Sequence, residues 1–148
     1  MQAIIFTGIQ ASGKSTFYKN HFFNTHVRIS MDLLNTRNKE KQFLETCFNT
    51  NAKFVVDNTN PSKTDREKYI KWAKENSYEV IGYYFSTTIK EALQRNNLRE
   101  GKEKIPEVGV RSCYRKMEIP SLSEGFDKLY FVKMKDDGFT IEDWKDEV

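Results

Sequence analysis

The stretch GIQASGKST, residues 8–16, constrains the fold of this chain more than any other. It places Gly8, Gly13, Lys14 and Ser15 at the fixed positions of a Gly-x-x-x-x-Gly-Lys-Ser motif. The apolar run AIIFT directly precedes the motif, and a long run without Gly or Pro follows it. The motif therefore lies between a predicted strand and a predicted helix, which is the context that a phosphate-binding loop requires.

Each part of this motif has a physical role in holding phosphate. Glycines let the loop curl so that successive backbone N–H groups point inward at a phosphate, and the helix N-terminus adds its positive dipole end. The Lys14 amine can reach the β and γ phosphates, and the Ser15 hydroxyl can ligate Mg²⁺. The alternative, a chance glycine-rich turn before a helix, explains fewer of these features. We therefore expect a nucleoside triphosphate with Mg²⁺, bound by the loop residues Gly8, Gln10, Ala11, Ser12, Gly13, Lys14, Ser15 and Thr16.

The composition suits one soluble domain. The chain has 148 residues, 38% of them hydrophobic, which is enough to form a core. The first predicted strand begins so close to Met1 that we expect no signal peptide, and no apolar run approaches the roughly 18 residues that cross a membrane. We expect a cytoplasmic protein without a membrane partner, in which Cys47 and Cys113 are buried free thiols.

The net charge of +3 is unevenly distributed. Residues 133–148 carry a net charge of −3, so that residues 1–132 carry +6. A basic body favours a polyanionic partner, because neutralising phosphates releases their counterions. A modest positive charge is also common on proteins that bind no nucleic acid, so the charge alone does not identify the partner.

Strand-like and helix-like runs alternate along the chain. The predicted strands are residues 2–7, 26–30, 53–57, 78–85 and 127–134. The predicted helices are residues 15–23, 40–49, 61–76 and 107–117, and one that Thr87 or Thr88 caps and that runs to about Arg99. This alternation with short links predicts an α/β fold, in which a five-stranded, mostly parallel sheet is covered by helices on both faces. We assign residues 1–134 to this domain and residues 135–148 to an acidic tail with one helical turn, which Phe139, Ile141 and Trp144 dock on the domain.

Two carboxylates stand where ligands bind in such sheets, at the carboxyl ends of the strands. Asp57 ends an apolar strand and is expected to hold Mg²⁺, directly or through water. Asp32 follows the second predicted strand, across from the expected γ-phosphate, where it can orient an attacking hydroxyl and accept its proton. The alternatives are structural, because a strand-end Asp also caps turns and Asp32 could serve as an N-cap.

Arginines supply the remaining candidates. Arg95 and Arg99 are four residues apart and project from one helix face, and they lead into a polar stretch that predicts a lid over about residues 95–106. Guanidinium groups on a closing lid would meet the negative charge of a transferring phosphoryl group. The spacing alone equally allows a solvated basic face. Arg37 follows Asp32 closely enough to touch an acceptor phosphate.

The chain resembles the kinase module of polynucleotide 5'-kinases, the enzymes that phosphorylate 5'-hydroxyl ends of DNA and RNA. Four blocks match in order across roughly residues 2–132: GIQASGKST, RISMD, VVDNTNP, and RNNLREGKEKIP followed by YRKMEIPSLSEGFDKLYFV. The first block is generic, whereas the DNTNP block and the last stretch are more specific. The resemblance implies a P-loop kinase fold that uses ATP, with Asp32 as general base and Asp57 as the family's third-strand acid. It also implies that the lid arginines Arg95 and Arg99 contact ATP and act with Lys14 in catalysis.

Two positions depart from that family. Met31 stands where the family commonly has Arg, and Asn35 stands where some members have an Arg that holds the acceptor's 3'-phosphate, a role that Arg37 could take here. These departures keep open a kinase of the same fold that acts on a nucleoside, sugar or antibiotic. A non-catalytic nucleotide-binding module is a second alternative, but the chain lacks the Asn-Lys-x-Asp motif of a GTPase switch. The resemblance also implies a 3'-phosphatase or ligase acting in trans, because family kinases are often joined to such domains.

Overall fold

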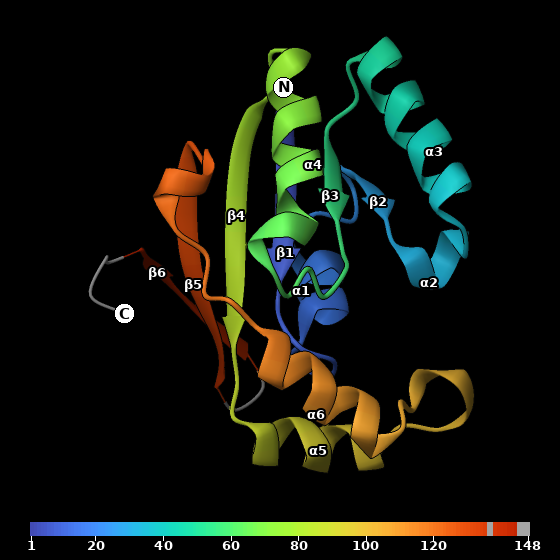
Figure 1. Cartoon of the computed structure of the whole chain (residues 1–148), viewed down its shortest axis with the longest axis vertical. Coiled ribbons are helices and arrows are strands. Elements are labelled where there is room, and N and C mark those ends of the chain that lie inside the picture. Colours follow the sequence, from blue (N-terminus) through green and yellow to red (C-terminus); the bar gives the residue numbers. More distant parts are fainter. Residues whose placement is uncertain (136–137, 145–148) are drawn as a thin grey trace.

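The computed structural model describes residues 1–135 and 138–144, and its centre is a six-stranded sheet (Figure 1). The strands are β1 (Gln2–Thr7), β2 (Val27–Ile29), β3 (Phe54–Val56), β4 (Glu79–Ser86), β5 (Lys128–Lys135) and β6 (Gly138–Asp143). Their order across the sheet is β2-β3-β1-β4-β5-β6. The first five strands are parallel, and β6 pairs antiparallel with β5. The predicted α/β class is confirmed.

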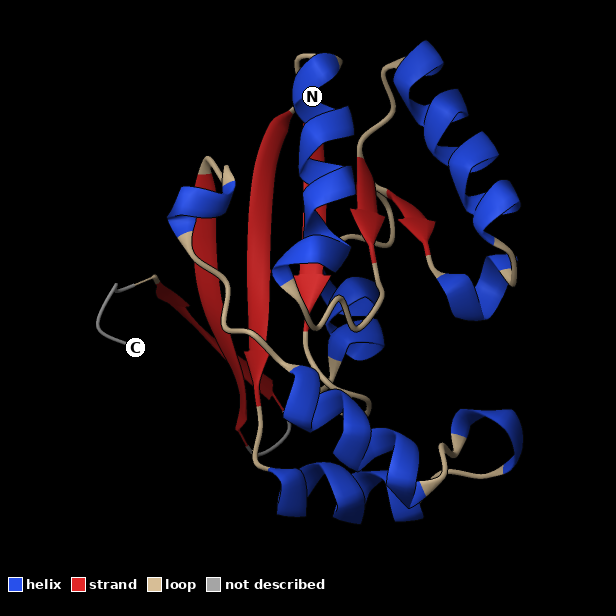
Figure 2. Cartoon of the chain, in the orientation of Figure 1, coloured by secondary structure: helices blue, strands red, loops and turns tan. Residues whose placement is uncertain are grey.

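Helices cover both faces of this sheet (Figure 2). They are α1 (Lys14–His21), α2 (Met31–Leu34), α3 (Arg37–Thr50), α4 (Lys63–Glu75), α5 (Ile89–Asn97) and α6 (Glu107–Lys116), with short 3-10 turns at Gly101–Glu103 and Leu122–Glu124. In Figure 1, α4 crosses in front of β1, and α5 and α6 pair beyond the strand ends to which the arrows point.

Strand β1 is buried on both faces because its side chains alternate between two hydrophobic cores. Ala3 and Ile5 belong to the core that α3 and α4 cover, whereas Ile4 and Phe6 pack on the opposite face with α1. The Phe6 and Phe17 rings lie 5.9 Å apart between centroids in an edge-on arrangement. A strand that is buried on both faces is apolar throughout, which explains the uninterrupted run before the phosphate loop. This central strand gives the loop a rigid base.

The sheet has six strands rather than the five expected from the sequence. Residues 138–143 were expected to lie in a docked tail with a helical turn, but they form β6 along the edge of β5. Pairing supplies hydrogen-bond partners for the β5 edge that a single helical turn would have left open. The Phe139 and Phe17 rings pack on one face of the sheet with their centroids 5.1 Å apart. The Trp144 and Tyr84 rings pack on the other face with their centroids 6.0 Å apart. The rest of the predicted tail, residues 136–137 and 145–148, lies outside the described residues.

Helices α3 and α4 begin at residues other than those expected, and capping side chains explain both differences. Helix α3 begins at Arg37 rather than near residue 40, because the Thr36 hydroxyl accepts a hydrogen bond from the Lys39 backbone N–H at 3.1 Å. Helix α4 begins at Lys63 rather than 61, because Ser62 and Asp65 form a reciprocal capping box. Both starts are decided by contacts within one helical turn.

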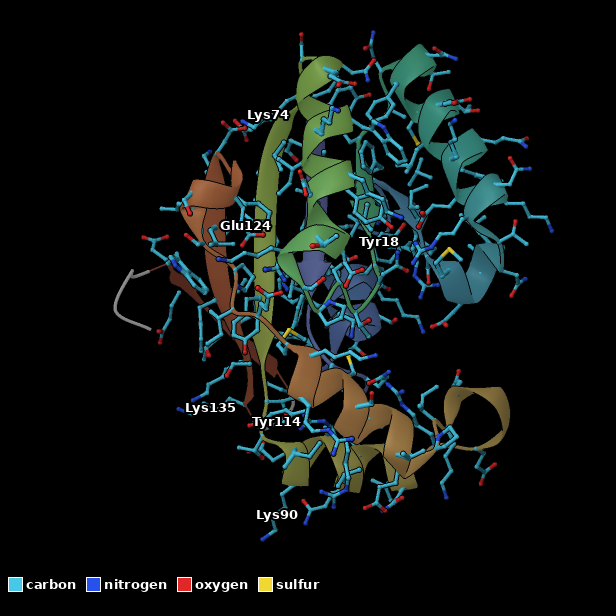
Figure 3. All side chains as sticks on the ribbon, in the orientation of Figure 1. Tyr18, Lys74, Lys90, Tyr114, Glu124 and Lys135 are labelled. Carbon is cyan, nitrogen blue, oxygen red and sulfur yellow. The ribbon has the colours of Figure 1, made fainter. Side chains whose placement is uncertain are left out.

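A buried ion pair ties α4 to the turn before β5. The Arg66 side chain is 0% exposed, and its Nε and Nη2 atoms donate to the two carboxylate oxygens of Glu124 at 2.8 and 3.1 Å (Glu124 is labelled in Figure 3).

Cys47 and Cys113 are buried free thiols, which confirms the expectation from the sequence. Over residues 1–135 and 138–144, no helix has the length and apolarity that crossing a membrane requires.

Candidate active site

Three neighbouring strands, β2, β3 and β1, end at one edge of the sheet, where a cleft of about 980 Å³ opens. The phosphate loop follows β1, Asp57 follows β3, and α2 with Asp32 follows β2. The cleft is lined by candidates from all these stretches, among them Gln10, Ala11, Gly13, Lys14, Ser15, Thr16, Asp32, Arg37, Asp57 and Arg99. The fold thus gathers residues that are far apart in the sequence into one site.

Glycine is required at two positions of the phosphate loop. A Cβ at Gly8 would lie 2.7 Å from Ser12 Oγ and 2.9 Å from Phe85 Cβ, both too close. Gly13 has a φ of +97°, a left-handed conformation that favours glycine, and it is the N-cap of α1. Because this cap has no side chain, the N-terminal N–H groups of α1 are open to a phosphate. The loop can therefore bind phosphate through its backbone.

Lys14 is the buried cation of this loop. Its Nζ donates to the carbonyl oxygens of Gly8 and Ile9 at 2.9 and 2.8 Å. Burial lowers the pKa of Lys14 to about 8, and the nearby carboxylate of Asp57 opposes this shift. A phosphate that contacts Nζ favours the charged form and raises this pKa again. Lys14 is thus placed where its charge depends on the ligand.

Ser15 and Asp57 form a pair of oxygen ligands that suits Mg²⁺. The Ser15 hydroxyl donates to Asp57 Oδ2 at 3.0 Å, which matches the roughly 3.0 Å between adjacent ligands of an octahedral Mg²⁺ with bonds of about 2.1 Å. Proteins commonly supply one or two oxygen ligands to this ion and leave the rest to substrate phosphates and water. Within the described parts of the chain, no group of three or more His, Cys, Asp or Glu could hold a metal on its own. When bound, Mg²⁺ neutralises charge on the phosphate oxygens.

Arg28 of β2 contacts the same two oxygen atoms. Its Nε donates to Asp57 Oδ2 at 2.9 Å and its Nη2 donates to Ser15 Oγ at 3.1 Å. A metal ion between these oxygens would have to share Asp57 with the guanidinium group or displace it. Sequence reasoning missed Arg28, and the only signal was a charged residue beside Ile29 in a short strand.

Helix α2 lines another part of the cleft, where the sequence predicts the acceptor to bind. Asp32 is exposed on this helix, and Met31, Leu33 and Tyr18 line the cleft with it (Tyr18 is labelled in Figure 3). Of the two acceptor-binding candidates, Arg37 lines the cleft. The structure shows its Nη1 donating to Glu40 Oε1 at 3.0 Å and to the Tyr69 hydroxyl at 3.0 Å. The other, Asn35, is the C-cap of α2 with a φ of +67°, and its amide turns back to the Leu33 carbonyl at 3.4 Å.

The two predicted lid arginines take different positions. Arg99 lines the cleft, and its Nη1 donates to the Glu103 carbonyl at 3.2 Å. Arg95 instead braces the phosphate loop, because its Nε donates to the Ala11 carbonyl at 2.6 Å. The segment between α5 and α6, expected to be a loop, contains a 3-10 turn. Asn96, which sequence reasoning missed, closes the base of that segment by accepting from Ile105 N at 2.9 Å and donating to its carbonyl.

Two further side chains were not predicted, Asn58 in the lining of the cleft and Glu40 behind it. Asn58 follows Asp57 and accepts a hydrogen bond from the backbone N–H of Met31 at 2.9 Å. Glu40 is 2% exposed and accepts from both Tyr69 and Asn58. A signal for Glu40 existed, because it lies at helical spacing with Leu44 and Cys47 on an otherwise apolar face.

A parallel sheet with a phosphate loop after its first strand and an acid at the neighbouring strand end defines a P-loop kinase fold, a class that binds nucleotides. The chain belongs to the AAA domain family, whose model matches residues 4–118. The matched region contains the phosphate loop, both candidate carboxylates, and Arg95 and Arg99, the arginines of the predicted lid.

Two curated relatives align over nearly the whole chain. One from Acanthamoeba polyphaga mimivirus, named as a bifunctional polynucleotide phosphatase/kinase, is 33% identical over 97% of this chain. Another of that name from Schizosaccharomyces pombe is 24% identical over 98% of this chain. The chain spans only 36% of the length of each relative. These alignments confirm that the chain resembles polynucleotide kinase modules over nearly its whole length.

A solved structure shows the same fold. Chaetomium thermophilum Kti12 in complex with ADP-AlF3 superposes with a TM-score of 0.64 at 16% identity. The superposition covers 91% of this chain and 90% of that one. At this identity, the likeness supports the arrangement of strands and helices rather than a shared substrate.

Proposed function

We propose that this domain transfers the γ-phosphate of ATP to 5'-hydroxyl ends of DNA or RNA. The observation that carries the proposal is that Asp32 and the phosphate loop line one cleft. A module that only binds nucleotide needs no carboxylate there, whereas a phosphotransferase needs a group that takes the proton of the attacking hydroxyl. The names of the two relatives, which include polynucleotide kinase, support this acceptor.

In the proposed reaction, Asp32 orients the 5'-hydroxyl and takes its proton while the oxygen forms a bond to the γ-phosphorus. The bond between that phosphorus and the β,γ-bridging oxygen breaks, and ADP leaves. Lys14 and Arg99 stabilise the charge on the transferring group from within the cleft. Arg95 joins them only after its guanidinium releases the Ala11 carbonyl.

Basic side chains along the cleft favour a polyanionic acceptor over a small neutral one. Those that line it besides Lys14 are Lys19, Arg28, Arg37, Lys68 and Arg99. A polymer that makes about three phosphate contacts should lose roughly tenfold or more in affinity between 50 and 200 mM salt. The small-acceptor alternative rests on Met31 and Asn35, the two positions at which the sequence departs from the pattern that the family resemblance implies. A small neutral acceptor would barely respond to salt.

We also propose that a 3'-phosphatase or a ligase works alongside this kinase on the same ends. The relatives' names pair a phosphatase with the kinase, and the chain aligns with about a third of each of those proteins. A phosphatase removes phosphate from the 3' end, and a ligase uses the 5'-phosphate that the kinase adds. The three activities would therefore act on the same strand break.

Transfer of label from γ-labelled ATP to a 5'-hydroxyl oligonucleotide tests the proposal. A 5'-phosphorylated oligonucleotide of the same sequence and a mixture of nucleosides serve as matched acceptors. We expect label only on the 5'-hydroxyl oligonucleotide, with the salt dependence described above. Label on a nucleoside alone would reassign the acceptor and keep the ATP site, and binding of ATP without any transfer would favour the non-catalytic module.

A further inference from the structure

The short helix that carries Asp32 is capped by a residue from another strand. Helix α2 has one turn, and a helix of that length is not stable on its own. Its N-cap, Ser30, makes no side-chain cap, and Ser30 Oγ finds no hydrogen-bond partner among the described residues. The capping oxygen instead comes from Asn58, whose Oδ1 accepts from Met31 N at 2.9 Å. The position of α2 is therefore tied to the end of β3.

The Asn58 amide is held in one orientation by two buried acceptors. Its Nδ2 donates to Glu40 Oε2 at 3.2 Å and to the Tyr69 hydroxyl oxygen at 3.3 Å. The Tyr69 hydroxyl in turn donates to Glu40 Oε2 at 2.8 Å. A flipped amide would place its oxygen against the carboxylate and its N–H groups against Met31 N–H, and both contacts are repulsive. We call Asn58, Tyr69 and Glu40 the Asn58 network. It holds Asn58 Oδ1 toward α2.

Two members of the network are buried, the third, Asn58, is half-buried at the cleft, and the Glu40 charge is paired. Glu40 and Tyr69 are each 2% exposed. Arg37 Nη1 donates to both Glu40 oxygens at 3.0 and 3.2 Å, and Lys68 Nζ lies 3.6 Å from Oε1. Burial raises the pKa of Tyr69, and the nearby Glu40 adds to the shift, so the phenol keeps the proton that it donates. In such a low-dielectric setting a satisfied network is rigid, and losing one member leaves the others unpaired.

We propose that Asn58 is a positioning residue, which Tyr69 and Glu40 orient so that it sets the place of Asp32 opposite the phosphate loop. This inference rests on the proposed function, because it takes Asp32 to be the general base. Asn58 directly follows Asp57, the candidate Mg²⁺ ligand, and also caps α2, the helix that carries Asp32. The two carboxylates are therefore linked through one short stretch after β3. A displacement of about 1 Å at a reacting group can cost about 100-fold in rate.

A matched pair of tyrosine variants tests this role. Tyr69→Phe removes one phenolic oxygen from the Asn58 network. Tyr78→Phe removes one from another buried tyrosine, whose hydroxyl donates to the Cys47 and Ala52 carbonyls at 2.9 Å, away from α2. We expect Tyr69→Phe to lower kcat about tenfold and Asn58→Ala about 100-fold, with the KM for ATP unchanged. Tyr78→Phe should leave kcat as in the original chain.

A double variant separates positioning from a general structural effect. In an Asp32→Ala background, Tyr69→Phe should cause no further loss of kcat, because the base that it positions is absent. A merely structural role would lower kcat by the same factor in both backgrounds and would overturn the inference. Loss of kcat in Tyr78→Phe equal to that in Tyr69→Phe would do the same.

Hydrogen exchange tests the contact without any acceptor. Exchange at the amides of residues 31–34, followed by mass spectrometry, should be faster in Asn58→Ala and Tyr69→Phe and unchanged in Tyr78→Phe. Unchanged exchange in Asn58→Ala would overturn the inference, whatever the acceptor. Absence of transfer to oligonucleotides by the original chain would instead contradict the proposed function, so the two failures are distinguishable.

Discussion

Raising the pH from 7 to 9 should weaken ATP binding to this domain, because Lys14 loses its proton in that interval. Burial lowers the pKa of Lys14 to about 8 in the chain without nucleotide, so about 90% of the Lys14 amines are charged at pH 7 and about 10% at pH 9. Phosphate oxygens at Nζ require the charged form, and they raise the pKa in the complex. Deprotonation of the free protein therefore competes with binding.

The expected magnitude follows from these fractions. If ATP binds only the protonated form, the apparent affinity falls by about tenfold between pH 7 and 9, or about 1.4 kcal/mol. At pH 8.5, binding should take up about 0.8 proton per ATP. A lysine with an ordinary pKa of about 10.4 would change the affinity by only a few per cent over the same interval.

Titration calorimetry at pH 7, 8 and 9 and constant ionic strength measures this affinity. Repeating the pH 8.5 titration in buffers with different ionisation enthalpies measures the proton uptake. Lys14→Met, which keeps the stem and removes the charge, should bind more weakly and show no fall through pH 8. An affinity for the original chain that stays level from pH 7 to 9 would refute the reasoning, since Lys14 would then remain charged without ligand or make no contact with the phosphates.

Three further perturbations have definite expected outcomes. Asp32→Ala should lower kcat by about 10²–10⁴ with little change in ATP affinity, as expected for a general base, and an equal loss of ATP binding would assign Asp32 to the nucleotide instead. Arg28→Ala should lower the Mg²⁺ concentration needed for half-maximal activity, because its guanidinium no longer contacts Asp57, and a higher requirement would contradict this. Arg66→Met should lower the free energy of unfolding by about 3–5 kcal/mol in urea titrations, because it leaves a buried carboxylate unpaired. Its control Arg111→Met, which removes an exposed pair, should cost about 0–1 kcal/mol, and similar losses in both would refute the burial argument.

The sequence predicts well those features that depend on nearby residues. The strand before the phosphate loop was expected at residues 2–7, and β1 has these bounds, because apolar β-branched residues and a glycine-rich stop act locally. Helix starts were less accurate, and α3 begins three residues early because a single hydroxyl on Thr36 caps it. The strand β6 was missed altogether, because its stability comes from pairing with β5 and not from its own composition.

What the sequence by itself determined is the phosphate loop, the strand–helix alternation and the placement of Asp32 and Asp57 after strands, since these follow from short-range periodicity and motif spacing. Only the tertiary structure decided which side chains meet at the site. Ser15 reaches Asp57 across 42 residues, and Asn58 reaches Met31 across 27. Such contacts depend on how neighbouring parallel strands end at one edge, which no local pattern encodes. The two carboxylates of the site were therefore predicted from the sequence, whereas the contacts of Arg28 and of the Asn58 network were not.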